Sequence, residues 1–371
     1  MASRRQFLTA LLASASLPGL SWADAGNPAF LSAAMDRSGA FALYGLRAGG
    51  EIAFRIALPA RGHAAAAHPT APEAVAFARR PGTYALVMDC VSGAVKKRLD
   101  APEGHHFYGH GAFVAGGDLL CTTESHIASG EGRVGLWSRA RRYARIGEIS
   151  SGGIGPHDIL ALPGRGKLAV ANGGIRTHPR TGREKLNLDT MRPNLAFLTP
   201  EAGPTEIIEV PRELHQNSLR HLALHPDGDV ACAFQWQGDI FESPPLLALA
   251  SENKGLTFAE APAEQLRALN GYAGSVAVSR SDGSIVITSP RGGVAHLYAR
   301  DGTFLSAMHR ADICGVAPHG GSIMATDGLG GLQIILLNGL QHLHAALRRH
   351  TNASAGKAIN AKLSHMNDRR L

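Results

Sequence analysis

The sequence has few cysteines and lacks the local motifs that identify common enzymes. Its four cysteines, Cys90, Cys121, Cys232 and Cys314, stand in apolar segments without a Cys-x-x-Cys pair or zinc-like spacing. It contains no P-loop, no His-Glu-x-x-His and no nucleophile elbow. We therefore expect buried thiols instead of a disulfide framework, and the sequence assigns no catalytic residue.

Long apolar runs are absent apart from residues 8–20, which are too few to span a bilayer. Arg4 and Arg5 precede this run, and Ala23-Asp24-Ala25 follows it. A basic start, a short apolar segment and an A-x-A site indicate a signal peptide, and paired arginines before Phe-Leu resemble the twin-arginine type. We expect residues 1–25 to be removed by a cut after Ala25, leaving a soluble periplasmic protein with no membrane span.

Basic residues outnumber acidic ones. The chain has 37 Lys and Arg and 30 Asp and Glu, which gives a net charge of +7. The basic residues are scattered and do not alternate with aromatics, which argues against nucleic acid as the partner. Hydrophobic residues make up 44% of the chain, enough for a sizeable core. The 44 glycines and 20 prolines indicate many tight turns, as short antiparallel strands require.

A unit of four short strands repeats along the chain from residue 30. One copy has apolar strands at residues 110–115, 118–123, 132–138 and 143–149, and another at 275–279, 284–288, 294–298 and 303–308. His63, His110 and His157 follow one another at intervals of 47 residues, and further units begin near residues 219 and 313. Units of this length with four strands each are typical of propeller blades.

These repeats predict an all-β fold, a single seven-bladed β-propeller with four-stranded antiparallel blades over residues 26–347. Residues 30–57 supply three strands, so the C-terminal end must complete that blade. Residues 173–193 form an insertion rich in Gly, Arg and His that is longer than a turn needs, and this makes it a candidate functional loop. We expect residues 348–371 to be a basic C-terminal tail.

Antiparallel order brings certain loops of every blade to one face. With strands A to D running outward from the axis, A begins at the face where B ends and C begins. Histidines at the starts of A strands, expected to ring the mouth of the channel and to be candidate metal ligands, are His63, His110, His157 and His221. The candidate ligand-binding residues on the same face are Arg79, Arg80, Glu124, Asn172, Arg176, His178, Arg220, Gln235 and Arg291.

Two interpretations of the histidines stay open. Converging neutral imidazoles can bind a transition metal such as iron or copper, whereas a histidine before strand A can instead hydrogen-bond neighbouring blades. The arginines repel one another unless an anion lies between them or unless they pair with carboxylates such as Glu124, Asp158 or Asp327. A metal chelate or a small anionic ligand therefore fits this face better than a bare cation.

Several motifs on this face resemble those of a known family. They are Arg79-Arg80-Pro81-Gly82, Gly109-His110-Gly111, Gly153-Ile154-Gly155-Pro156-His157, Ala171-Asn172-Gly173-Gly174-Ile175, Ser218-Leu219-Arg220-His221-Leu222 and Ser289-Pro290-Arg291-Gly292. Over residues 30–343 the chain resembles a family of twin-arginine-exported bacterial proteins known only as a domain of unknown function, number 1513. The resemblance implies a seven-bladed propeller encoded beside imelysin-type periplasmic proteins, and hence a role in iron acquisition. The chain departs from the family near its end, where Asn338-Gly339-Leu340-Gln341-His342 replaces an expected Trp-Asp-Asn-His-like segment.

Three functions remain in competition. The first is a periplasmic binding or accessory protein for iron or an anionic iron chelate, held on the His/Arg face. The second is a propeller enzyme of the lactonase or quinoprotein type, with Glu124, Asn172 and Asp327 as oxygen ligands for a metal at the channel mouth. The third is a scaffold for an imelysin-type partner, with the loops as a docking surface.

Overall fold

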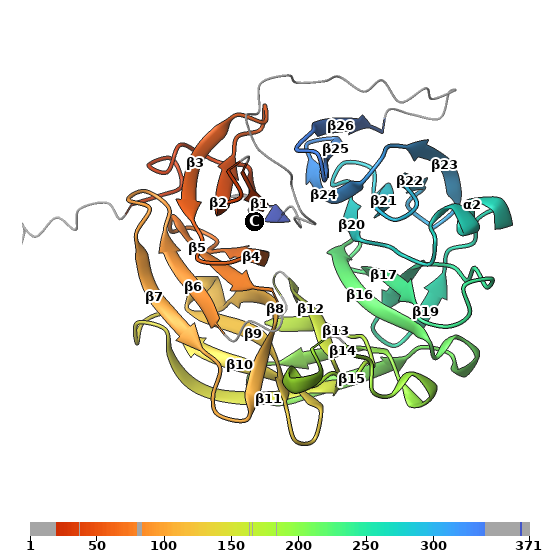
Figure 1. The fold of residues 1–371 in the computed structure, drawn as a ribbon, viewed down its shortest axis with the longest axis horizontal. Helices are drawn as coiled ribbons and strands as arrows, with labels where there is room; N and C mark the ends of the chain where they lie inside the picture. Colours follow the sequence, from red (N-terminus) through yellow and green to blue (C-terminus); the bar gives the residue numbers. More distant parts are fainter. Residues whose placement is uncertain are drawn as a thin grey trace, which may run out of the picture.

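The repeating strand pattern produces seven antiparallel sheets that follow one another around a single axis, as Figure 1 shows for the computed structural model. The structure describes residues 20–36, 38–79, 84–162, 164, 166–182 and 184–337, together with the backbone of 364–365. Six sheets have four strands, and the seventh has three within the described part. The predicted all-β, seven-bladed propeller is therefore confirmed.

Each blade is a meander, and in blades 2 to 7 the first strand lies nearest the axis. Blade 1 contains β1 (Phe30–Met35), β2 (Phe41–Leu46) and β3 (Ile52–Ala57); blade 2 contains β4 (Gly62–Ala67), β5 (Glu73–Ala78), β6 (Tyr84–Asp89) and β7 (Val95–Asp100); blade 3 contains β8 (His105–Val114), β9 (Leu119–His126), β10 (Glu131–Ser138) and β11 (Ala144–Ile154). Blade 4 contains β12 (Pro156–Leu162), β13 (Lys167–Asn172), β14 (Asn194–Thr199) and β15 (Gly203–Glu209); blade 5 contains β16 (Asn217–Leu224), β17 (Val230–Trp236), β18 (Leu247–Ser251) and β19 (Gly255–Phe258). Blade 6 contains β20 (Ser275–Val278), β21 (Ile285–Ser289), β22 (Val294–Tyr298) and β23 (Phe304–His309); blade 7 contains β24 (Ile313–His319), β25 (Ser322–Asp327) and β26 (Leu332–Leu336).

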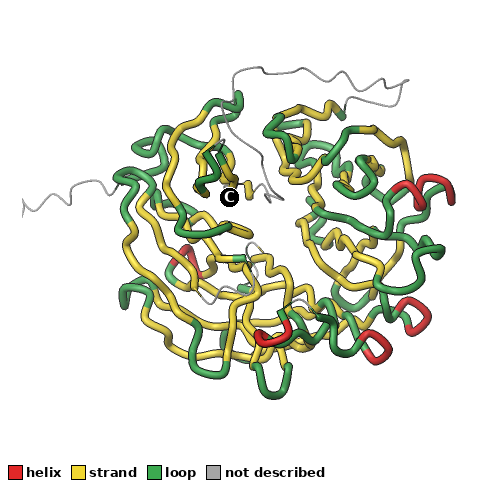
Figure 2. Tube along the Cα trace, viewed as in Figure 1, coloured by secondary structure: helices red, strands yellow, loops and turns green. Residues whose placement is uncertain are grey.

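Helical structure is confined to short turns, which Figure 2 shows against the strands that make up most of the ring. The segments are α2 (Ala263–Ala268) and the 3-10 turns η1 (Ala115–Gly117), η2 (Pro179–Thr181), η3 (Leu188–Thr190) and η4 (Arg212–Leu214). No described helix has both the length and the apolar character needed to cross a membrane. The insertion at 173–193 contains η2 and η3 and is a long loop of blade 4.

The ring is closed by the two ends of the chain. β27 (Ser364–His365) pairs antiparallel with β1, joining Phe30 to His365 and Leu31 to Ser364. The first blade thus takes its inner strand from the C-terminal end, in agreement with the prediction that this end completes it. The other residues of the expected tail, at 348–363 and 366–371, lie outside the described residues.

The hydrophobic core lies between neighbouring blades, where the residues of the inner strands are small and apolar. Gly111 of β8 illustrates the packing, because a Cβ at that position would collide with the Phe77 ring of blade 2. In the outer strands the exposure of the side chains alternates instead. The first residues of β11 are in turn exposed, partly buried and exposed. The four cysteines are all buried and unpaired, as predicted.

Residues 20–27 belong to this fold. Trp22 is 2% exposed and packs with Leu31, Leu43 and Ala65 in the core between blades 1 and 2. Its indole N–H donates to the carbonyl of His68 at 2.9 Å. A cut after Ala25, as the sequence suggests, would remove this side chain. Residues 1–19 of the expected signal peptide lie outside the described residues.

Candidate functional site

The inner strands of four successive blades, β4, β8, β12 and β16, share an irregularity near one end. Their register with the second strand shifts between Gly62 and Ala65, Phe107 and Gly111, Pro156 and Asp158, and Leu219 and His221. A β-bulge adds residues to one strand and re-aims their side chains. Residues within the shifted segments include His63, His110, His157 and Arg220, and His221 directly follows Arg220.

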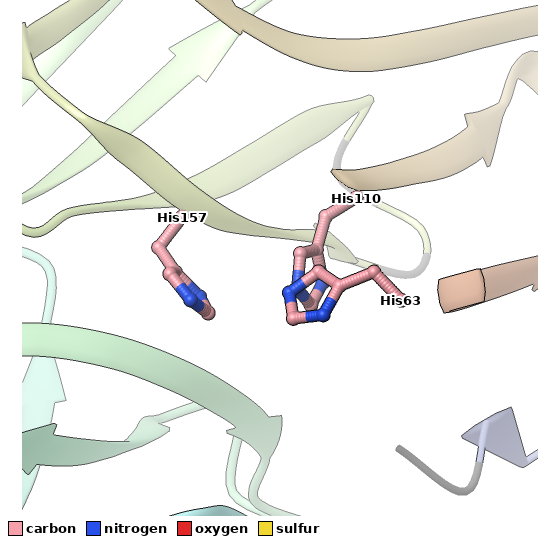
Figure 3. A group of neighbouring side chains, drawn as sticks. All are labelled: His63, His110 and His157. Atoms are coloured by element: carbon pink, nitrogen blue, oxygen red, sulfur yellow. The ribbon is translucent and has the colours of Figure 1, made fainter. Parts of the chain in front are cut away.

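The bulges bring the four histidines together at what we call the mouth face, the face where the inner strands begin. Ring centroids of His63 and His110 are 4.8 Å apart, and those of His157 lie 5.1 Å from His110 and 4.9 Å from His221. Figure 3 shows the first three converging from separate strands. This convergence is what the face-sharing argument predicts.

Three of the histidines are close enough to hold one metal ion. One ligand atom from each of His63, His110 and His157 lies within 4.8 Å of the others, and within the described residues this is the one group of its kind. A metal bound to imidazole at about 2.1 Å brings its nitrogens to roughly 3.4 Å of one another in a tetrahedral site.

The tautomer of His157 is set by a backbone contact. Its Nδ1 donates to the carbonyl oxygen of Arg220 at 2.9 Å, so Nε2 is the basic nitrogen. Burial, the Arg220 guanidinium and the three neighbouring histidines hold the pKa of His157 well below its ordinary value. The imidazole is therefore neutral at neutral pH, which is the form that binds metal ions.

A buried carboxylate supports the cluster from behind. Asp158, 3% exposed, accepts from His110 Nδ1 at 2.9 Å through Oδ1 and lies 3.8 Å from His221 Nδ1 through Oδ2. The amides of Ile159 and Leu222 also donate to it. A carboxylate behind a ligating histidine is common at metal sites, where it fixes the ring and raises its basicity. The sequence left open a pairing of Asp158 with an arginine, and in the structure Asp158 contacts His110 and these two amides.

Cations lie beside the histidines on the mouth face. Arg220 is 8% exposed, and Arg291 stacks over the Tyr272 ring at 4.4 Å. Burial and the charges of Arg220 and Arg291 lower the pKa of Lys185, a residue of the 173–193 insertion. Lys185 was missed as a candidate because its position depends on how the insertion folds back over the face.

Three predicted oxygen ligands make contacts elsewhere. Glu124, fully buried, accepts from Arg145 at 2.8 Å and from Thr122 at 2.7 Å within blade 3. Asn172 bonds Ser151 and Asn194, joining blade 3 to blade 4. Asp327 pairs with Arg310 and caps the turn after β25. The oxygen set of a lactonase-type site is therefore committed to structural contacts.

Other predicted residues hold the loops of the mouth face. Arg176 donates to the Ala128 carbonyl at 2.8 Å, and His178 Nδ1 accepts from the Arg180 amide at the start of η2. Gln235 donates to the Ala273 carbonyl between blades 5 and 6. The Arg79 amide donates to the Arg61 carbonyl next to the inner strand of blade 2, and Arg80 lies outside the described residues.

The insertion is anchored over blade 3. The Tyr108 hydroxyl of β8 lies 3.4 Å from the Ile175 carbonyl and 3.3 Å from Thr177 Oγ1. Ser218 Oγ donates to the Gly173 carbonyl at 2.6 Å. Contacts at its first residues thus reach both neighbouring blades and fix the loop near the histidines.

Comparison with known proteins gives a family but no activity. A family model described as "Protein of unknown function (DUF1513)" matches residues 56–353. No curated protein matches the sequence. Among solved structures, hydrazine synthase of Kuenenia stuttgartiensis is similar with a TM-score of 0.58 and 12% identity, over 80% of this chain and 91% of that one. A chain from the mitotic checkpoint complex is similar with a TM-score of 0.54 and 11% identity, over 79% and 77%. At these identities the likeness concerns the fold alone.

Proposed function

The chain belongs to the DUF1513 family of proteins of unknown function, and we propose that it is a periplasmic binding or accessory protein for iron or an anionic iron chelate. The observation that carries this proposal is the convergence of His63, His110 and His157 on one point at the mouth face. Three imidazoles, in their neutral form, suit iron, copper, nickel or zinc. They leave coordination positions open for a ligand that the metal brings with it.

The neighbouring cations favour a chelate over a bare ion. The charges of Arg220 and Arg291 contribute, after burial, to the lowered pKa of Lys185, and guanidinium groups bind carboxylate or phosphate oxygens through paired donors. A metal that arrives with anionic ligands neutralises these charges, whereas a bare cation meets repulsion. This supports a role in holding or passing on a chelate such as ferric citrate.

Metal analysis and titration of the purified protein test the proposal. We expect saturable binding, at micromolar concentration or below, of ferric citrate, Fe(II), Zn(II) or Cu(II), with haem as a further probe. His110→Ala combined with His157→Ala should abolish binding and leave the fold intact. His309→Ala, at an exposed position of β23, is the matched control.

The opposite outcome is equally clear. If no metal or chelate binds and the double variant unfolds more easily, the histidines are structural contacts between blades, and the proposal is wrong. Under that result the polar contacts of His110 and His157 would account for their positions.

A second function is favoured by where apolar side chains are exposed. The three most exposed large hydrophobics among the described residues are Phe241 at 86%, Ile240 at 85% and Leu329 at 66%. All three lie in loops between second and third strands, hence on the mouth face. Asp239 orders the loop that carries Ile240 and Phe241. Its carboxylate accepts from the Phe241 amide, and its carbonyl accepts from Trp236 Nε1. Apolar tips on ordered loops suit docking of a protein partner, for which an imelysin-type periplasmic protein is the proposed candidate.

Binding of such a partner to immobilised protein tests this second function. Ile240→Ser with Phe241→Ser should weaken binding at least tenfold. Ile146→Ser with Leu305→Ser, at exposed positions of outer strands, is the control and should have no effect. Equal binding by both variants would exclude these loops as the docking surface.

A further inference from the structure

The turn between β10 and β11 carries three arginines in a fixed backbone shape. It reads Arg139-Ala140-Arg141-Arg142 and is closed by the Tyr143 amide, which donates to the Ser138 carbonyl at 2.7 Å. The Arg139 amide donates to the Asp118 carbonyl of the neighbouring turn at 2.9 Å. Arg142 and Tyr143 both have left-handed φ values, +53° and +58°, which cost energy in residues with a side chain. Contacts elsewhere must therefore offset this strain.

Glu73 of blade 2 supplies those contacts. Its side chain is 5% exposed, and it accepts from the Tyr143 hydroxyl at 2.5 Å and from Arg139 Nη2 at 3.0 Å. Lys96 of β7 donates to the same carboxylate at 2.6 Å. Burial raises the pKa of Glu73, but the hydrogen bonds from Arg139, Lys96 and Tyr143 outweigh it and lower that pKa to about 2. One ionised carboxylate thus joins the outer strand of blade 2 to the arginine turn of blade 3.

The groups around this joint are exposed and are both basic and apolar. Arg141 and Arg142 are exposed, and the Lys96 side chain is 42% exposed. Val91 and Val95, beside Lys96, are 41% and 50% exposed. β7 and β11 are the outermost strands of blades 2 and 3, so these groups lie on the outside of the ring (Figure 1). We call this surface the basic rim; its residues are Val91, Val95, Lys96, Arg139, Arg141 and Arg142.

The valines of the basic rim are held by an ordered turn. The Asp89 carboxylate accepts from the amides of Val91 and Ser92, each at 2.9 Å. The Cys90 amide donates to the Pro72 carbonyl at 2.8 Å, which ties this turn to the one between β4 and β5. The apolar side chains are therefore presented from a fixed backbone.

Charge is unevenly distributed over the far face, the face opposite the mouth face, where first strands lead into second strands and third strands into fourth. In blades 2 and 3, the charged residues of the described far-face turns are Arg139, Arg141, Arg142 and Asp118. In blades 4 to 6, they are Glu201, Asp227, Asp229, Glu252, Asp282, Asp301, Lys254, Arg280 and Arg300. The first set is basic and the second is acidic, so an anionic surface attracts one side of the far face and repels the other.

We propose that the basic rim docks the protein edge-on against an anionic phospholipid bilayer. Guanidinium and ammonium groups pair with lipid phosphates, and exposed apolar side chains between them enter the headgroup region. The acidic turns of blades 4 to 6 keep the rest of the far face away from the bilayer. In this orientation the mouth face stays open to the side, and the docking is independent of what that face binds.

Co-sedimentation of the purified protein with vesicles tests the proposal. We expect binding to an equal mixture of phosphatidylglycerol and phosphatidylcholine and none to phosphatidylcholine alone. Raising the salt from about 0.1 M to about 1 M shortens the Debye length from about 10 Å to about 3 Å and should release the protein. A chelator in the buffer should change nothing, so failure here leaves the metal proposal untouched.

A matched pair of variants locates the surface. Arg141→Gln with Arg142→Gln should weaken binding to the anionic vesicles roughly 30-fold, the equivalent of about 1 kcal/mol for each basic residue at such a surface. Lys254→Gln with Arg280→Gln removes the same charge from exposed positions in the acidic half of the far face and should leave binding unchanged or stronger. Thermal unfolding checks both folds. Equal loss in the two variants would mean that net charge alone drives binding and would overturn the proposal.

Two further probes separate a bilayer from other anions. Soluble glycerol phosphate at millimolar concentration should not compete with vesicles, because it offers a single anion to a surface that binds several. Full competition would show a site for free phosphate instead of a docking surface. Retention on immobilised polyglutamate without binding to vesicles would assign the rim to an acidic protein. Either result would overturn the proposal.

Discussion

Nδ1 of His110 lies 2.9 Å from Oδ1 of Asp158, although the two residues belong to neighbouring blades. The contact links β8 to β12. Because Nδ1 of His110 carries the proton that it donates, Nε2 is the basic nitrogen of this ring. The same carboxylate holds the amide of Leu222 in blade 5. One buried side chain therefore orients groups from three blades around the candidate metal position.

Replacing Asp158 by Asn should weaken metal binding without unfolding the protein. The amide can still accept from the backbone but lacks the charge that raises the basicity of His110, and loss of such a partner typically costs about 10–100-fold in affinity. Zn(II) or Fe(II) titration gives the measurement, and thermal unfolding checks the fold. Asp100→Asn, at an exposed position of β7, should leave affinity unchanged. Unaltered affinity in Asp158→Asn would contradict a supporting role for this carboxylate.

Arg220→Gln should separate chelate binding from metal binding. The carbonyl that holds His157 belongs to the backbone and remains, so the imidazole keeps its orientation. Loss of a charge-assisted hydrogen bond of about 1.5–3 kcal/mol predicts roughly 10–100-fold weaker binding of ferric citrate. Binding of bare Zn(II) should stay equal or improve, because one repelling charge has gone. Arg98→Gln on β7 is the control; equal loss for both ligands would argue against an anion subsite.

Trp22→Ala should destabilise the folded protein strongly. Truncating a buried Trp costs about 3–5 kcal/mol in the free energy of unfolding. Trp22→Phe keeps most of the packing and loses the hydrogen bond to His68, at a cost of about 1 kcal/mol from the bond alone. Urea unfolding measures both. Wild-type stability in Trp22→Ala would mean that residues 20–27 do not contribute to the core.

His296 should make stability fall with acid between pH 6.5 and 4. Burial lowers its pKa to about 4, so the unfolded chain binds a proton in this window that the folded chain refuses. The contribution of neutral His296 to the free energy of unfolding is fully present above pH 6.5. It falls by roughly 2 kcal/mol between pH 7 and 5. His296→Leu should flatten the pH profile of unfolding by that amount. Parallel profiles of the two proteins would refute this assignment.

Strand positions follow largely from alternation and turn residues. β22 has the predicted bounds, and most other strands of blades 3 and 6 differ by one to three residues at an end, but β8 begins five residues earlier and β11 ends five residues later than predicted. β8 starts earlier because the chain stays extended beyond the bulge at Gly109, whose φ is +96°. Antiparallel order alone predicts that the four histidines share one face, whereas their convergence also depends on the bulges of the inner strands.

Side-chain partners were harder to predict because they depend on space left by residues far away in the sequence. Glu124 turns toward Arg145 since Gly135 has no side chain, and a Cβ there would collide with the carboxylate. Asn172 likewise packs against Gly153, where a Cβ would come within 2.7 Å. Trp22 belongs to a segment that reads as a leader, and only three-dimensional packing reveals it as core.

The pairing of Phe30 with His365 also governs when the ring can form. Contacts between residues so far apart raise the contact order, which slows folding. Until residues 364–365 are synthesised, the inner edge of β1 lacks its partner, and an open strand edge can pair with other chains. Ring closure therefore waits for residues 364–365, and truncation before residue 364 would favour aggregation over a stable ring.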